Sequence, residues 1–143
     1  MPIIFEAEGI EIPSALSEEN ITKWIDRVAA SHQKEAGDLT YIFCSDQKIL
    51  EINNQYLQHD YYTDIITFDY SEDNLISGDI FISLDTVKSN SEEFGTDYNE
   101  ELHRVIIHGI LHLCGFDDHT DEEEKEMRNL ENQALSLIIQ SGK

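Results

Sequence analysis

Two histidines, His108 and His112, stand four residues apart inside a run of apolar residues. The run, Leu102 to Leu113, is apolar on nearly every side of a helix, which is typical of a helix buried all round. Residues four apart share one helical face. An unpaired imidazole in a core costs about 1–3 kcal/mol, and one metal ion satisfies two rings at once. The pair therefore predicts a metal site, and two ordinary core histidines are the alternative.

Further ligand types follow where this helix is expected to end. Gly115 is the natural residue just past a helix C-terminus, because glycine tolerates the left-handed conformation. Asp117, Asp118 and His119 come next. Two histidines plus a third histidine or a carboxylate, with a fourth position open for water, form the ligand set of a catalytic zinc site. Zinc and nickel both suit imidazole, so the residue types leave the ion open.

Glycine occupies the position at which zinc peptidases with an H-E-x-x-H helix carry their general base. The residue here is Gly109, and its lack of a carboxylate argues against a metallopeptidase. Glycine in mid-helix costs about 1 kcal/mol relative to alanine. We therefore expect another backbone or the substrate to approach the helix closely at Gly109.

The pattern H-G-x-L-H-L-x-G-F at residues 108–116 resembles the signature of the YbeY family, bacterial rRNA maturation factors also described as metal-dependent endoribonucleases. Residues 53–68, with Asn53, Tyr56 and the stretch T-D-I-I-T-F, and residues 78–83, G-D-I-F-I-S, resemble two further family blocks. The resemblance implies metal-dependent cleavage of single-stranded RNA during 3′-end maturation of small-subunit rRNA. It implies rRNA and the small ribosomal subunit or assembly factors as partners. A non-catalytic, zinc-containing ribosome-assembly adaptor is the alternative.

The third ligand is the first departure from the family, which has three histidine ligands. In a gapless alignment the third histidine falls on Asp118, and Met127 falls on a family methionine. The resemblance then implies His108, His112 and Asp118 as the zinc ligands. His119 takes the third place if the loop holds one extra residue.

Leu57 is the second departure, because the family often has an arginine there that is thought to serve RNA function. This puts an arginine-assisted step in doubt. Arg104 lies four residues before His108, on the face of the ligand pair. It is the best candidate for binding a phosphate, and an ion pair to Glu100 or Glu101 is the alternative.

Several other polar residues are weaker candidates. Four flank or occupy a loop, where they either face the metal cleft or serve as ordinary loop residues: His59, Asp60, Thr63 and Asp64. Asp79 is a candidate hydrogen-bond acceptor for a ligand imidazole, although an exposed strand carboxylate is the stronger expectation. His32 and His103 are expected at the surface.

The charge of the chain is strongly negative, with 30 acidic and nine basic residues and a net charge of −21 over 143 residues. Because phosphate affinity comes largely from lysine and arginine, we expect weak RNA affinity unless a local basic patch or a ribosomal partner supplies it. The length fits one domain, residues 1–143. No apolar run approaches the roughly 20 residues of a membrane span. Cys44 and Cys114 lie in apolar contexts that suit core packing in a cytoplasmic protein.

The elements that must position these residues form an α+β fold, with a small mixed sheet of about four strands, a central buried metal-binding helix and surrounding helices. Strands are expected over residues 2–5, 39–44, 63–70 and 78–84. Helices are expected over residues 17–34, 45–56, 85–93, 98–114 and 121–139. The third and fourth strands are close enough to pair as a hairpin, and Asp97-x-x-Glu100 is a capping box for the central helix.

Overall fold

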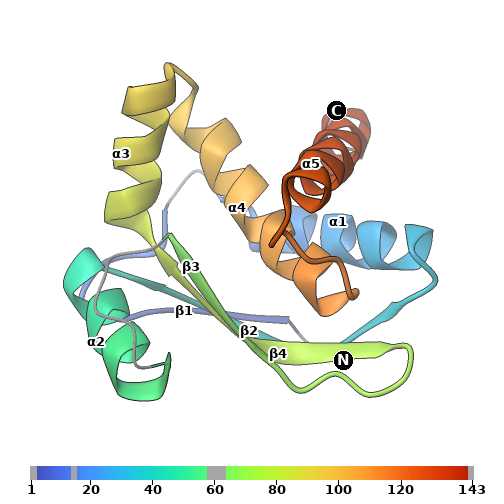
Figure 1. Ribbon diagram of the computed structural model, residues 1–143, viewed down its shortest axis with the longest axis horizontal. Helices are drawn as coiled ribbons and strands as arrows, with labels where there is room; N and C mark the ends of the chain where they lie inside the picture. The colour runs from blue at the N-terminus through green and yellow to red at the C-terminus, as the bar shows by residue number, and fades with distance from the viewer. Residues whose placement is uncertain (1–2, 14–15, 58–63, 142–143) are drawn as a thin grey trace.

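The computed structural model describes residues 3–13, 16–57 and 64–141 and shows four strands and five helices over them (Figure 1). The elements follow in the order β1 (Ile3–Ala7), α1 (Glu18–Ser31), β2 (Glu35–Cys44), α2 (Asp46–Leu57), β3 (Ile65–Asp69), β4 (Leu75–Ser83), α3 (Leu84–Phe94), α4 (Tyr98–Leu113) and α5 (Asp121–Ser141). The expected α+β class is confirmed, and none of the helices over these residues is long and apolar enough to cross a membrane.

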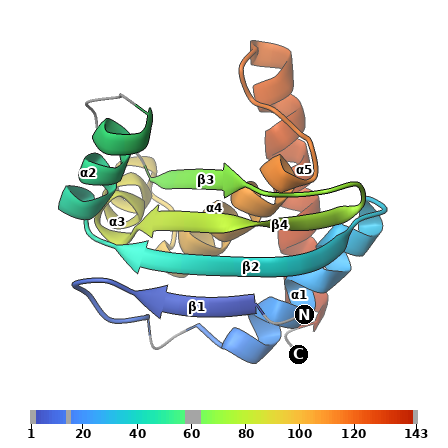
Figure 2. The same cartoon turned by 90° about the horizontal axis from the view of Figure 1, so that it is seen from below.

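The four strands form one mixed sheet in the order β1-β2-β4-β3, as Figure 2 shows from below. β1 pairs with β2 and β2 pairs with β4 in parallel, while β3 runs antiparallel to β4. The predicted hairpin is confirmed, with Ile65 opposite Ile82 and Asp69 opposite Gly78. β3 is therefore an edge strand. It lies beside the central strand β4, and both strands contact helix α4.

The first crossover differs from the expected boundaries. α1 ends at Ser31, three residues before the predicted Lys34, and Gln33 takes a positive φ of 59° that a continuing helix does not allow. The chain turns at once into β2, which begins at Glu35 and not at Leu39. Glycine and aspartate are uncommon in strands. Gly37 and Asp38 therefore weaken the strand pattern, and the sequence does not predict the first residues of β2.

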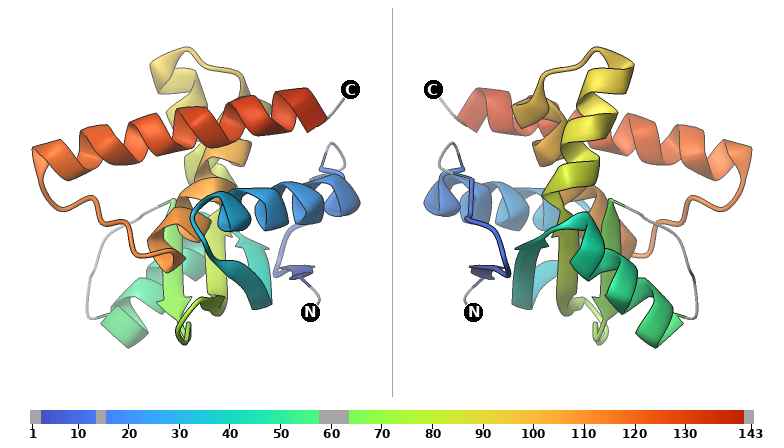
Figure 3. Two further views of the ribbon diagram at one scale, coloured as in Figure 1. Left: turned by 90° about the vertical axis from the view of Figure 1, so that its right-hand side faces the viewer. Right: turned by 90° about the vertical axis from the view of Figure 1, so that its left-hand side faces the viewer.

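Helix α4 lies between the sheet and the outer helices. Its buried residues cover every side of the helix except the face with Arg104, His108 and His112, and they join a core that includes residues of α1, β2, β4 and α5: Leu102, Val105, Ile106, Ile107, Ile110, Leu111 and Leu113. Figure 3 shows α5 crossing over α1 and α4 on one side of the sheet, with α2 on the other side. A second cluster, made by Cys44, Ile49, Ile52 and Ile66, packs α2 against the opposite face of the sheet.

Two buried polar side chains tie these layers together. The Trp24 indole N–H of α1 donates to the Ala134 carbonyl of α5 over 2.7 Å. The Tyr41 hydroxyl of β2 donates to the Ile106 carbonyl of α4 over 2.9 Å. Each bond satisfies a donor that has no access to water. Together they fix α4 relative to the sheet and α5 relative to α1.

Candidate metal centre

The C-terminal end of α4 turns the chain back toward its own last turn. Gly115 follows the cap residue with a φ of 104°, a conformation that glycine adopts without strain. Its N–H donates to the His112 carbonyl over 3.0 Å, and the Phe116 N–H donates to the Leu111 carbonyl over 3.1 Å. These two bonds form the Schellman arrangement. They send the following loop back past the histidine pair.

The other end of that loop is fixed by the start of α5. The Thr120 N–H donates to a Glu123 carboxylate oxygen over 3.1 Å, and the Glu123 N–H donates to the Thr120 hydroxyl over 3.1 Å. This reciprocal pair is a capping box. With both ends held, the short loop between α4 and α5 presents Asp118 at a defined place.

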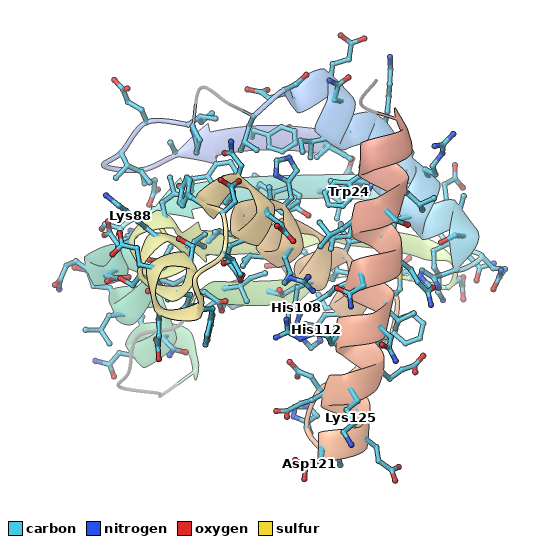
Figure 4. The ribbon with its side chains drawn as sticks, turned by 90° about the horizontal axis from the view of Figure 1, so that it is seen from above. Trp24, Lys88, His108, His112, Asp121 and Lys125 are labelled. Carbon is cyan, nitrogen blue, oxygen red and sulfur yellow. The ribbon has the colours of Figure 1, made fainter. Side chains whose placement is uncertain are left out.

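Three ligand atoms converge at that place. The Nε2 atoms of His108 and His112 lie 3.0 Å apart, and Asp118 Oδ2 lies 3.4 Å from the first and 3.6 Å from the second. Figure 4 shows the two imidazoles together beside α5. One ligand atom from each residue lies within 4.8 Å of the others, so the cluster could hold a metal ion.

The spacing of these atoms fits a first-row metal. Zinc bonds nitrogen and oxygen at about 2.0–2.2 Å, and the ligands of a tetrahedron then lie about 3.3–3.6 Å apart. The three observed separations, 3.0, 3.4 and 3.6 Å, fall near that range. Two imidazole nitrogens and one carboxylate oxygen are also ligands that zinc accepts. The described residues therefore fit a three-ligand site with a fourth position left for solvent or substrate.

A neighbouring carboxylate orients the His108 ring. His108 Nδ1 lies 2.6 Å from Glu131 Oε2. Since a carboxylate only accepts hydrogen bonds, the Glu131 contact puts the neutral ring's proton on Nδ1. The Nε2 lone pair of His108 then faces the converging ligand atoms.

The surroundings of the two imidazoles shift their pKa values in opposite directions. Burial lowers the pKa of His108, but the hydrogen bond and charge of Glu131, with Asp118 and Asp64, outweigh it and raise that pKa above the ordinary value. Burial and the charge of His108 lower the pKa of His112. Burial opposes ionisation of Glu131, yet bonds from His108 and Arg104 hold its pKa below the ordinary value. The carboxylates around the two histidines therefore favour a positive charge between the imidazole rings.

The cluster opens onto a hollow of about 800 Å³ between the end of α4 and the first half of α5. Its walls are lined mostly by charged and polar residues: His108, Asp118, Asp121, Glu124, Lys125, Met127, Arg128, Asn129 and Glu131. Such an opening gives a polar or charged substrate access to the cluster at His108 and Asp118.

The structure brings Asp118, and not His119, to the histidine pair, because His119 lies exposed outside the cluster. Arg104 is ion-paired, but its partner is Glu131 at 2.9 Å and not Glu100 or Glu101. Its second terminal nitrogen donates to the Asn132 side chain over 2.8 Å. Both ends of the guanidinium therefore contact α5, and binding of a phosphate by Arg104 stays a prediction.

The expectation of a backbone or substrate against Gly109 is wrong. A Cβ at this position would lie 3.2 Å from methyl carbons of Ile65 and Ile80. Glycine thus lets α4 pack closely on side chains of β3 and β4.

The carboxylate against a ligand imidazole is Glu131 and not Asp79. Asp79 faces the side of the sheet opposite to the buried Ile80, where the Tyr70 hydroxyl lies 3.5 Å from it. Among the residues that the structure describes, Glu131 is the one charged residue that is buried, with 6 % of its surface exposed. Its signal in the sequence is its place in the apolar stripe of α5, beside Met127, Leu130 and Ala134.

The remaining candidates divide into near and far groups. Asp64 is half-buried and close enough for the charge of His108 to act on its pKa, which burial raises. His32 and His103 are partly exposed, and their rings pack on Phe116 and Trp24. His59, Asp60, Thr63 and the side chain of Leu57 lie outside the described part of the chain. Burial raises the pKa of the Cys114 thiol to about 11, which suits its expected role as core packing.

Comparison with known proteins identifies the family. The family model described as Endoribonuclease YbeY matches residues 3–138. The Endoribonuclease YbeY of Parabacteroides distasonis is 60% identical over 138 residues, which are 96% of each chain. That of Porphyromonas gingivalis strain W83 is 48% identical over 95% of this chain and 89% of its own. The solution structure of TM1509 from Thermotoga maritima matches with a TM-score of 0.69 and 28% identity, over 96% of this chain and 89% of that one. This chain belongs to the Endoribonuclease YbeY family.

Proposed function

We propose that this chain is a metal-dependent endoribonuclease whose ion is held by His108, His112 and Asp118. The observation that carries the proposal is the convergence of three ligand atoms at one edge of an open hollow, in a chain of the Endoribonuclease YbeY family. Zinc is the proposed ion, and nickel is the alternative, since both accept imidazole ligands.

A bound ion supplies Lewis acidity and lowers the pKa of water toward neutrality. The protein's part is to hold two imidazole lone pairs and one carboxylate oxygen at fixed separations, so that no reorganisation is needed when charge develops. In the hydrolysis, a water oxygen bonds to phosphorus, one P–O bond breaks, and the proton passes to the leaving oxygen. The hollow between α4 and α5 provides the space for the phosphodiester.

Single-stranded RNA is the proposed substrate, and the 3′ end of small-subunit rRNA is the proposed target in the cytoplasm. The support is the family to which the chain belongs. The net charge of −21 makes the small subunit or an assembly factor the proposed source of much of the affinity, because lysine and arginine supply most phosphate binding. Lys125 and Arg128 on the wall of the hollow are the local cations available to the RNA backbone.

A structural adaptor is the rival hypothesis, and it requires a closed site with four protein ligands. Within residues 3–13, 16–57 and 64–141, the converging group consists of three residues and faces a hollow. This favours an open, catalytic position. A peptidase is disfavoured because Gly109 offers no general base on the ligand helix.

An RNA cleavage assay tests the proposal. Purified protein is incubated with a single-stranded RNA that carries the 3′ region of small-subunit rRNA, alone, with a chelator, and after zinc or nickel is added back. We expect cleavage that the chelator abolishes and the ion restores, and that His112→Ala lacks under all conditions. Cleavage that persists in the chelator and in His112→Ala would refute the metal-dependent mechanism.

A further inference from the structure

The buried carboxylate of Glu131 on α5 joins side chains of α4 and α5 in a network beside the proposed ligands. Glu131 Oε2 lies 2.6 Å from His108 Nδ1, while Glu131 Oε1 accepts from Arg104 over 2.9 Å. Arg104 also donates to Asn132 over 2.8 Å. Glu131 and Arg104 are 27 residues apart in the chain, so only the docking of α5 on α4 brings them together.

The two oxygens of Glu131 have different partners, and both are in use. One receives the imidazole N–H and the other receives the guanidinium. Arg104 and His108 share a face of α4, one turn apart, so a single carboxylate spans both. The carboxylate is 6 % exposed, and a buried charge persists only where partners of this kind compensate it.

We infer that Glu131 is a positioning residue for the metal site: held by Arg104 and Asn132, it fixes the tautomer and the direction of the His108 ring. The ring then presents a lone pair at Nε2, 3.4 Å from Asp118 Oδ2. Carboxylates that accept from a ligand imidazole usually matter for affinity, and their loss weakens metal binding about 10–100-fold. This inference rests on the proposed function, and it adds that α5 completes a site whose ligands lie outside that helix.

The substitution Glu131→Gln disrupts the paired contacts with His108 and Arg104 while it changes the side-chain volume little. A carboxamide has one acceptor oxygen and one N–H₂ donor, whereas Arg104 and the Nδ1–H of His108 both require an acceptor. If the oxygen serves Arg104, the N–H₂ group faces Nδ1 and favours the tautomer that carries its proton on Nε2. That tautomer has no lone pair at the converging atoms.

The test is the affinity of the whole chain for Co²⁺ and Zn²⁺, measured without RNA. Glu131→Gln is compared with Glu124→Gln, which removes one charge from the same hollow but has an exposed side chain without a bond to either imidazole. The absorption bands of bound Co²⁺ report the ligand geometry. We expect Glu131→Gln to bind about 10–100-fold more weakly with altered bands, and Glu124→Gln to bind within about threefold of wild type with unchanged bands.

Equal affinity and equal bands in wild type and Glu131→Gln would overturn the inference and leave the proposed function intact. A wild type that binds neither ion would overturn both. Circular dichroism checks that each variant folds. If Glu131→Gln does not fold, Arg104→Met decides the question, because it leaves the carboxylate held by His108 alone. Weaker binding by Arg104→Met then supports the inference, and wild-type affinity contradicts it.

Discussion

Two regions of this protein satisfy their polar side chains in different ways. In the core, Trp24 and Tyr41 each donate one hydrogen bond to a backbone carbonyl, at 2.7 and 2.9 Å. At the end of α4, polar side chains satisfy one another. His108 contacts Glu131, Glu131 contacts Arg104, and the two imidazoles face each other across 3.0 Å.

The difference separates a polar group that serves packing from one that serves chemistry. Each core donor bonds to one backbone carbonyl, and loss of that bond should affect only stability. At the end of α4, two ring nitrogens and one carboxylate oxygen lie close enough together to bind one metal ion. Such a grouping is unfavourable for stability alone and is typical of a functional site. Variants in the core should therefore change stability and spare metal binding, and variants in the cluster should do the reverse.

Trp24→Ala should have the largest effect on stability. The indole is 1 % exposed, and removal of a buried aromatic side chain costs about 3–5 kcal/mol. Urea unfolding followed by circular dichroism measures the loss. Zinc affinity of the folded fraction should stay at the wild-type value. A loss of zinc affinity without a loss of stability would contradict the separation of the two regions.

His112→Ala should have the largest effect on function. Loss of an outer partner of a metal ligand costs about 10–100-fold, so loss of a proposed ligand should reduce RNA cleavage by at least about 100-fold. Added zinc should raise the melting temperature of wild type, because an ion that binds only the folded state stabilises it. The same addition should leave His112→Ala unchanged. A comparable zinc-induced shift in this variant would speak against the site.

Tyr41→Phe should have a smaller effect, limited to stability. The variant loses one buried hydrogen bond to Ile106, which is worth about 0.5–1.5 kcal/mol. The Ile106 carbonyl lies in the middle of α4 and keeps its helical partner. Urea unfolding should show this loss while RNA cleavage stays at the wild-type rate. A marked fall in cleavage would mean that the core bond also positions the ligand helix.

Removal of the cations on the hollow should give the smallest effect, visible in the salt dependence of RNA binding. Lys125→Ala and Arg128→Ala remove cations from the wall, and Lys88→Ala removes an exposed one on α3, across the molecule in Figure 4. Each lost contact to a phosphate of single-stranded RNA should lower the slope of log K against log salt by about 0.7. The slope for Lys88→Ala should equal that of wild type. Equal slopes for all three variants would remove α5 from the RNA interface.

Much of the fold follows from patterns along the chain. The all-round apolar run predicts a central helix, and α4 is that helix. The alternating segments predict the hairpin, and β3 and β4 form it. Gly115 marks the helix end through its need for a positive φ, which allows the loop and Asp118 to be placed beside the histidine pair. Each of these features depends on residues close in sequence.

The features that sequence reasoning missed depend on contacts between distant elements. Glu131 lies 23 residues from His108, and helical spacing within one element does not indicate which residue of another helix will reach an imidazole. The same limit explains why Arg104 pairs with Glu131 and not with its near neighbours. It also explains Gly109, whose close neighbours are isoleucines on two strands.

The most direct test of the three-residue site is the metal content of five proteins measured by mass spectrometry: wild type, His108→Ala, His112→Ala, Asp118→Ala and His119→Ala. The geometry predicts about one zinc or nickel ion per chain in wild type and in His119→Ala. It predicts none in the other three, whose ligand atoms converge in the structure. A wild type that takes up neither ion, or a panel in which His119→Ala loses the metal while Asp118→Ala keeps it, would contradict the site described here.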